Sequence, residues 1–151
     1  MFSGSDSDSA IPPTMLQAYR ETLYKVFAQP DSAEIAFTLR IDEPCTELLA
    51  AHKRRRADCS AFVTAYNPFS QALAARENAA RQLTLVRELD DRGLAWDEGV
   101  GEHPSNSWPG EPSCLVYGIA LEAAKVLAAH FEQNAFVWSG SDGVPRLILL
   151  R

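Results

Sequence analysis

Residues 59–93, CSAFVTAYNPFSQALAARENAARQLTLVRELDDRG, predict a buried strand, a sharp polar turn and a long helix. Residues 61–66 are apolar at nearly every position, which is typical of a strand covered on both faces. Pro68 cannot donate to a sheet ladder and disfavours the helical conformation at Asn67, so we expect the strand to end there. Ser70 is expected to cap the helix that follows.

The predicted helix carries one stripe of side chains at three- and four-residue spacing, and this stripe contains an unexpected amide. Its members are Ala75, Asn78, Ala79, Gln82, Leu85, Val86 and Leu89. A buried amide must find hydrogen-bond partners, so Asn78 needs polar groups near it. Two interpretations stay open: Asn78 fixes the turn at 67–70, or it also faces a ligand.

Length and composition favour one small domain that needs no disulfide or structural metal. At 151 residues the chain is long enough for its own hydrophobic core. Residues 1–13 are polar and acidic and are expected to be a disordered tail, which leaves residues 14–151 as a single α+β domain. No apolar run is long enough for a membrane span, and the N-terminus does not resemble a signal peptide. We therefore expect a cytoplasmic protein.

Cysteines and charge narrow the classes of partner and cofactor. Cys45, Cys59 and Cys114 are odd in number and lack CxxC spacing, so we expect reduced thiols and no metal. No glycine-rich phosphate loop is present either, and no cofactor is expected. The net charge of −6 argues against nucleic-acid binding. The basic run at 52–56 is interpreted as a solvated loop, with contact to a phosphate or an acidic partner as the alternative. Homo-oligomerisation is left open.

The order of elements predicts the architecture. A helix over 12–29 precedes a strand at 33–41, and a long connection at 42–58 is expected to close a wide hairpin onto the buried strand. The remaining elements are a strand at 94–98, a loop at 99–110, a strand at 114–119, a helix at 120–133, and strands at 135–139 and 144–150. This order matches a two-layer, ferredoxin-like split βαβ core with an antiparallel sheet. The first and last strands are expected at the sheet edges, with the N-terminal helix over an open face or edge.

This topology predicts a polar site at one end of the sheet. The turn after the buried strand, the start of the long helix and the starts of two later strands all meet there. The predicted ligand-binding residues are Asn67, Ser70, Asn78, Trp108, Glu111, Ser113 and Gln133, with His103 overhead. We expect Asn67, Asn78, Glu111 and Gln133 to form one hydrogen-bonded cluster.

The same motifs carry a family resemblance. AYNPFSQ, RENAARQL, the tryptophan of SNSWPGEPSCLVYGI, and HFEQNAFVW stand in this order along residues 33–150. In order and spacing they resemble the bacterial family catalogued as domain of unknown function 3293. The basic connection at 42–58 departs from that pattern and inherits nothing from it. The resemblance implies no activity.

Three classes of function remain open at this stage. A small-molecule binding or sensing module fits the amides and the carboxylate, which suit a polar ligand, either anionic or amide-bearing. A small hydrolase or transferase would use Glu111 or His103 as acid or base, although Ser70, Ser113 and Cys114 lack a nucleophile motif. A protein-interaction module would use a sheet edge or the acidic surface.

Overall fold

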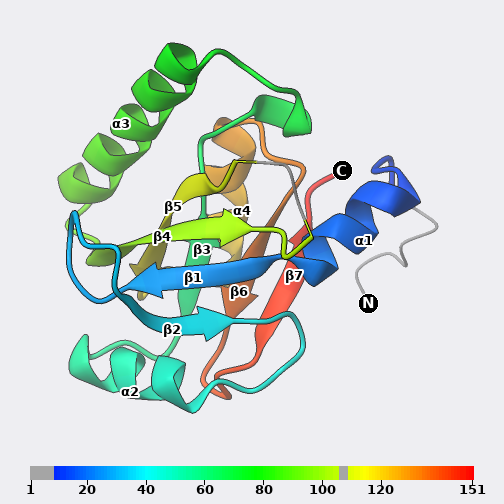
Figure 1. Ribbon diagram of the computed structural model, residues 1–151. Helices are drawn as coiled ribbons and strands as arrows, with labels where there is room; N and C mark the ends of the chain where they lie inside the picture. The colour runs from blue at the N-terminus through cyan, green and yellow to red at the C-terminus, as the bar shows by residue number, and fades with distance from the viewer. Residues whose placement is uncertain (1–8, 106–108) are drawn as a thin grey trace.

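Seven strands form one antiparallel sheet in the computed structural model, which describes residues 9–105 and 109–151 (Figure 1). The strand order is β2-β1-β4-β5-β3-β6-β7. The strands are β1 (Leu23–Phe27), β2 (Ile35–Leu39), β3 (Ser60–Val63), β4 (Trp96–Glu102), β5 (Glu111–Tyr117), β6 (Ala135–Ser139) and β7 (Pro145–Leu149). The helices are α1 (Pro13–Glu21), α2 (Thr46–Arg54), α3 (Ala75–Asp91) and α4 (Leu121–His130), with the short 3-10 helix η2 (Pro68–Ser70).

The predicted α+β class with an antiparallel sheet is confirmed. The buried strand β3 pairs antiparallel with β5 on one side and with β6 on the other. The predicted edge strands also lie at the edges, β2 at one end of the order and β7 at the other. β6 and β7 pair antiparallel and form a hairpin through residues 140–143.

Helices cover both faces of the sheet, so the prediction of two layers is wrong: the helix on the second face was not predicted. Side chains of α3 and α4, among them Leu85 and Leu127, pack with Val116 and its neighbours on one face. On the other face Leu48 and Ala51 of α2 pack against strand residues such as Leu115. Residues 46–54, which lie in the predicted connection, form a helix that buries Leu48 and Ala51 against the sheet.

The predicted N-terminal helix over 12–29 is wrong in its second half. Helix α1 ends at Glu21, Thr22 is extended, and Leu23–Phe27 is the strand β1. The residues LYKVF fit a helical stripe, but they also alternate between half-buried and buried positions as a strand does. Pairing with β2 and β4 on both sides decides in favour of the strand.

The predicted hairpin across 42–58 is also wrong. β2 pairs with β1, while the connection passes across the second face of the sheet as α2. The basic run at 52–56 begins inside this helix. Its His52 is buried, and its Arg55 forms an ion pair with Asp97 and lies over the ring of Tyr117, so neither belongs to a freely solvated loop.

The packed chain reaches further towards the N-terminus than the expected boundary at residue 13. Ile11 is only 3% exposed, and Ser9 Oγ donates to the backbone carbonyl of Arg151 (2.6 Å). Residues 1–8 lie outside the described residues. The segment before α1 therefore belongs to the folded unit from residue 9 onward.

We predict that Ile11→Ala lowers the free energy of unfolding by about 2 kcal/mol or more, because it empties a buried site. Ile35→Ala is the matched control, since Ile35 is 38% exposed, and it should cost less than about 1 kcal/mol. Urea unfolding of both variants measures the difference. Equal destabilisation by the two substitutions would show that Ile11 does not pack as described.

Buried His52 provides a second prediction, on pH. Its Nε2 lies 2.8 Å from Ser60 Oγ, and its Nδ1 is buried without a hydrogen-bond partner among the described residues. Burial lowers the pKa of His52, although the nearby Asp58 charge opposes this. The unfolded chain therefore takes up a proton at a higher pH than the folded protein, and this contribution to stability is lost as pH falls through the unfolded pKa, about 6.5.

The melting temperature of the wild type should therefore fall more between pH 7.5 and 5.5 than that of His52→Gln. His130→Gln serves as the control, since His130 is exposed, and it should keep the wild-type pH dependence. Identical pH profiles for the wild type and His52→Gln would contradict this account.

Candidate functional site

Side chains from α3 hold the backbone of residues 65–67 where it leaves the sheet. Gln82 Oε1 accepts from the Ala65 N–H (2.9 Å), and Arg81 Nε donates to the Ala65 carbonyl (2.7 Å). Asn78 Oδ1 accepts from the Asn67 N–H (2.8 Å). Gln133 adds a fourth contact from the α4–β6 connection, because its Nε2 donates to the Tyr66 carbonyl (3.1 Å). We call this set of four side chains the backbone clamp.

The clamped segment continues into a turn with an uncommon backbone. Asn67, Phe69 and Ser70 all have positive φ angles, of 49°, 52° and 60°. Left-handed backbone at residues other than glycine costs on the order of 1–3 kcal/mol each, so surrounding contacts must hold this turn. The Phe69 N–H donates to the Glu132 carbonyl (2.6 Å), which ties the turn to the end of α4.

The predicted capping role of Ser70 is wrong. Helix α3 begins five residues later, and its N-cap residue Ala74 makes no side-chain cap. Ser70 Oγ instead contacts the hydroxyl of Tyr19 and accepts from Asn134 Nδ2 (3.2 Å). Because the turn is left-handed, no helix can start at residue 70. The Ser70 hydroxyl is therefore available to contact Tyr19 of α1 and Asn134 before β6.

Asn78, Asn67 and Glu111 form a directed chain of hydrogen bonds. Asn78 Nδ2 donates to Asn67 Oδ1 (2.8 Å), which also accepts from the Leu73 N–H (3.1 Å). Asn67 therefore presents its Nδ2 to Glu111, and this group donates to Oε2 (2.7 Å). The Asn67 N–H can only donate, so the atom of the Asn78 amide that faces it must be the oxygen. This contact fixes the orientation of the Asn78 amide.

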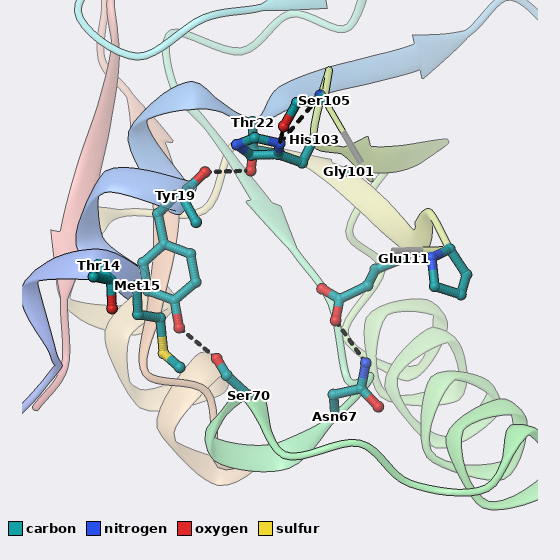
Figure 2. Close-up of a pocket in the computed structure, with 12 residues that line it drawn as sticks. Thr14, Met15, Tyr19, Thr22, Asn67, Ser70, Gly101, His103, Ser105 and Glu111 are labelled. Atoms are coloured by element: carbon teal, nitrogen blue, oxygen red, sulfur yellow. Dashed lines mark hydrogen bonds between the residues drawn. The ribbon is translucent and has the colours of Figure 1, made fainter. Parts of the chain in front are cut away.

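Glu111 has one oxygen committed to this chain and one that faces a hollow. Oε2 accepts from Asn67, and Oε1 has no hydrogen-bond partner among the described residues. In Figure 2 the second oxygen points into the space between Glu111 and Tyr19. Burial raises the pKa of Glu111, and the hydrogen bond from Asn67 opposes that shift only in part.

The hollow is a cavity of about 520 Å³ at the end of the sheet, roofed by α1 (Figure 2). It lies between α1, the 67–70 turn and the β4–β5 connection. Its lining is Thr14, Met15, Ala18, Tyr19, Thr22, Asn67, Ser70, Gly101, His103, Ser105, Pro109 and Glu111. Three of the predicted ligand-binding residues, Asn67, Ser70 and Glu111, thus line one cavity together with His103.

The other predicted residues are close to the cavity but serve different roles. Asn78 is buried behind Asn67 and orients it. Ser113 is buried, and its Oγ donates to the carbonyl of Glu111 (2.9 Å). Gln133 belongs to the backbone clamp and has no direct bond to the Asn67–Asn78–Glu111 chain. Trp108 lies outside the described residues.

Sequence reasoning missed the contribution of α1 and of the residue two positions after His103. Tyr19 of α1 contacts Ser70, and Ser105 Oγ lies 2.9 Å from His103 Nδ1. Tyr19 belongs to an ordinary amphipathic helix, so no pattern in the sequence assigns it to this end of the sheet. Ser105 could have been noticed from its spacing to His103, although that spacing is common in loops.

The fold and the cavity define a small α+β protein with a polar site at one end of an antiparallel sheet. Residues 63–136 match the family described as "Protein of unknown function (DUF3293)", which confirms the resemblance over that stretch. No curated protein and no solved structure shows a significant match to the chain. Within the described residues, no group of three or more His, Cys, Asp or Glu could hold a metal, and no helix is long and apolar enough to cross a bilayer.

The directed chain predicts the effect of removing its buried member. Asn78→Ala removes the acceptor of the Asn67 N–H and one of the two donors to Asn67 Oδ1, which should lower the free energy of unfolding by about 1–3 kcal/mol. Arg76→Ala on an exposed position of the same helix should change it by less than about 0.5 kcal/mol. Chemical denaturation measures both, and an Asn78→Ala variant as stable as Arg76→Ala would remove Asn78 from the chain.

Proposed function

We propose that this protein binds a small neutral or cationic molecule, which enters the cavity and donates a hydrogen bond to Glu111. The observation that carries the proposal is the geometry of this carboxyl group. Oε2 is occupied by Asn67, whereas Oε1 faces the cavity without a partner among the described residues. Oε1 borders the cavity and is accessible from it, so a ligand donor can reach it and form a charge-assisted hydrogen bond there.

The size and lining of the cavity support a small ligand that is mostly apolar with one polar end. Its volume of about 520 Å³ falls within the range of about 300–1,000 Å³ that is usual for ligand pockets. The roof is formed by α1 side chains such as Met15 and Ala18, while Asn67 and Glu111 lie on the opposite wall. The ligand would place its polar end against Glu111 and its apolar body under α1.

The charges at the cavity favour a neutral or positively charged ligand. None of the described lining residues is Lys or Arg, and Glu111 is the acidic member of the lining. An anionic ligand would meet a carboxylate without a compensating cation, which low-dielectric surroundings make unfavourable. Of the two ligand classes that the sequence left open, an amide-bearing molecule is therefore supported over an anion, and an amine fits the same carboxylate.

Gly101 keeps the space in front of Glu111 open. It is the cross-strand partner of Glu111 in the β4–β5 pair, so a side chain at 101 would project on the same side of the sheet. A Cβ built there would have only ordinary contacts, 3.6 Å to Thr22 and 3.9 Å to Tyr24. The backbone therefore tolerates a side chain at 101, and glycine leaves the volume free for a ligand.

The order of the central elements supports the finer fold assignment that we propose here. The unit β3-α3-β4-β5-α4-β6 has its strands in the order β4-β5-β3-β6, with both helices on one face. That arrangement is typical of a ferredoxin-like split βαβ fold. Three free cysteines suit a reducing compartment, which supports a cytoplasmic location as part of the same proposal.

Three compounds of similar shape test the ligand class: benzylamine, benzyl alcohol and benzoate. Benzylamine should raise the melting temperature most and benzoate least, because only the amine brings a positive donor to Glu111. In Glu111→Gln the advantage of benzylamine over benzyl alcohol should disappear. The amine effect should also weaken in the wild type as pH falls through the raised pKa of Glu111, since protonation removes the negative charge.

Glu111→Gln is a suitable variant because it keeps the internal hydrogen bond. The amide oxygen can accept from Asn67 Nδ2, while the amide nitrogen takes the position of Oε1. Because burial raises the pKa of Glu111, its ionised form destabilises the folded state at neutral pH. The variant should therefore melt no lower than the wild type at pH 7.

Gly101→Leu provides an independent block of the cavity. It should abolish the response to benzylamine while the fold persists, as circular dichroism would show. A benzylamine response that survives both Glu111→Gln and Gly101→Leu would place binding elsewhere and overturn the proposal.

A further inference from the structure

Two side chains that line the cavity after β4, His103 and Ser105, are joined by hydrogen bonds to each other and to Glu21 of α1, and the binding proposal does not use them. His103 Nε2 lies 2.9 Å from Glu21 Oε1, at the end of α1. His103 Nδ1 lies 2.9 Å from the hydroxyl oxygen of Ser105. The carboxylate comes from a helix, while His103 and Ser105 follow β4, so the fold brings Glu21 to a histidine 82 residues away.

The hydrogen bonds determine where the imidazole proton lies. The backbone N–H of Ser105 donates to His103 Nδ1 (3.3 Å), so this nitrogen is an acceptor. The proton of the neutral ring is therefore on Nε2 and is donated to Glu21. With Nδ1 unprotonated, the Ser105 hydroxyl donates to it, and Nδ1 is the base that can receive the hydroxyl proton.

Glu21 is held as an anion behind the ring. Gln17 Nε2 donates to its other oxygen, Oε2 (2.8 Å). This hydrogen bond, followed by that with His103, lowers the pKa of Glu21. An ionised carboxylate at Nε2 stabilises the imidazolium that forms when Nδ1 takes up a proton. The side chains of Ser105 and His103 also line the cavity that contains Glu111.

We propose that Ser105 is a nucleophile, with His103 as its general base and Glu21 as the residue that orients His103, and that the cavity hydrolyses small carboxylic esters. This proposal rests on the proposed binding function, because the substrate would be a neutral or cationic ester whose donor group contacts Glu111. The proposal gives Ser105 the role of a nucleophile, which ligand binding alone does not require.

The reaction balances with water as the only co-substrate. Ser105 Oγ forms a bond to the acyl carbon as its proton moves to His103 Nδ1. The bond between the acyl carbon and the alkoxy oxygen breaks, and the leaving alcohol takes that proton. Water then attacks the acyl-serine and gives a proton to Nδ1, and Ser105 regains it as the carboxylic acid leaves.

A reactive-serine probe tests the nucleophile in the intact chain. Diisopropyl fluorophosphate should add one phosphoryl group to the native wild type, and peptide mass spectrometry should locate it on Ser105. Ser105→Ala should remove the label without changing the melting temperature. His103→Gln should slow labelling by about 10²–10⁴-fold, the usual contribution of a general base. Glu21→Gln should slow it less.

Ester turnover and ligand binding then separate the two proposals. p-Nitrophenyl acetate hydrolysis should be lost in Ser105→Ala, whereas the benzylamine response of that variant should remain. Glu111→Gln should lose the advantage of benzylamine over benzyl alcohol but keep its phosphoryl label. Absence of a label on native Ser105, or a label on Ser70 in its place, would overturn the nucleophile while leaving the binding proposal standing.

Discussion

For residues 65–67, side chains of α3 make the backbone hydrogen bonds that a neighbouring strand would otherwise make. The positions of the site residues depend on these hydrogen bonds. A chain that leaves a sheet must find new partners for its backbone N–H and C=O groups. Gln82, Arg81 and Asn78 supply them at successive points along one face of the helix. Gln133 supplies a further one from the other side. The turn can therefore adopt a conformation that local preferences alone would not stabilise.

The same arrangement gives the site a fixed hydrogen-bond direction. Because the clamp uses the oxygen of Asn78, its nitrogen must face Asn67, and the nitrogen of Asn67 must face Glu111. The amide of Asn78, at the start of these hydrogen bonds, thus determines that one oxygen of Glu111 accepts a hydrogen bond from Asn67. The free oxygen is the one on the cavity side. The hydrogen bonds that hold the turn therefore end at the carboxyl group that we propose as the recognition site.

The sequence was informative where backbone chemistry leaves few choices. The buried amide at Asn78 had to find partners near the turn at Asn67-Pro68, as it does, although β3 already ends at Val63 and not at Asn67 as expected. The sequence was misleading where one pattern fits two structures. Residues 23–27 match both a helical stripe and a strand, and only the pairing of β1 with β2 and β4 distinguishes them. The capping role of Ser70 failed because three left-handed residues precede a helix that starts later.

Contacts between distant segments explain what the sequence could not predict about the site. Nothing local to Tyr19 or Glu21 connects them with Ser70 or His103, because those contacts arise only when α1 packs over the end of the sheet. The family match at residues 63–136 contains Asn67, Asn78 and Glu111 but begins well after α1. Asn67 and Glu111 thus lie inside the matched stretch, and the α1 residues that line the cavity, among them Met15 and Tyr19, lie outside it. In the proposed binding mode the polar end of the ligand contacts the matched stretch and its body contacts α1, so a substitution in α1 should alter the fit of the body without removing the hydrogen bond to Glu111.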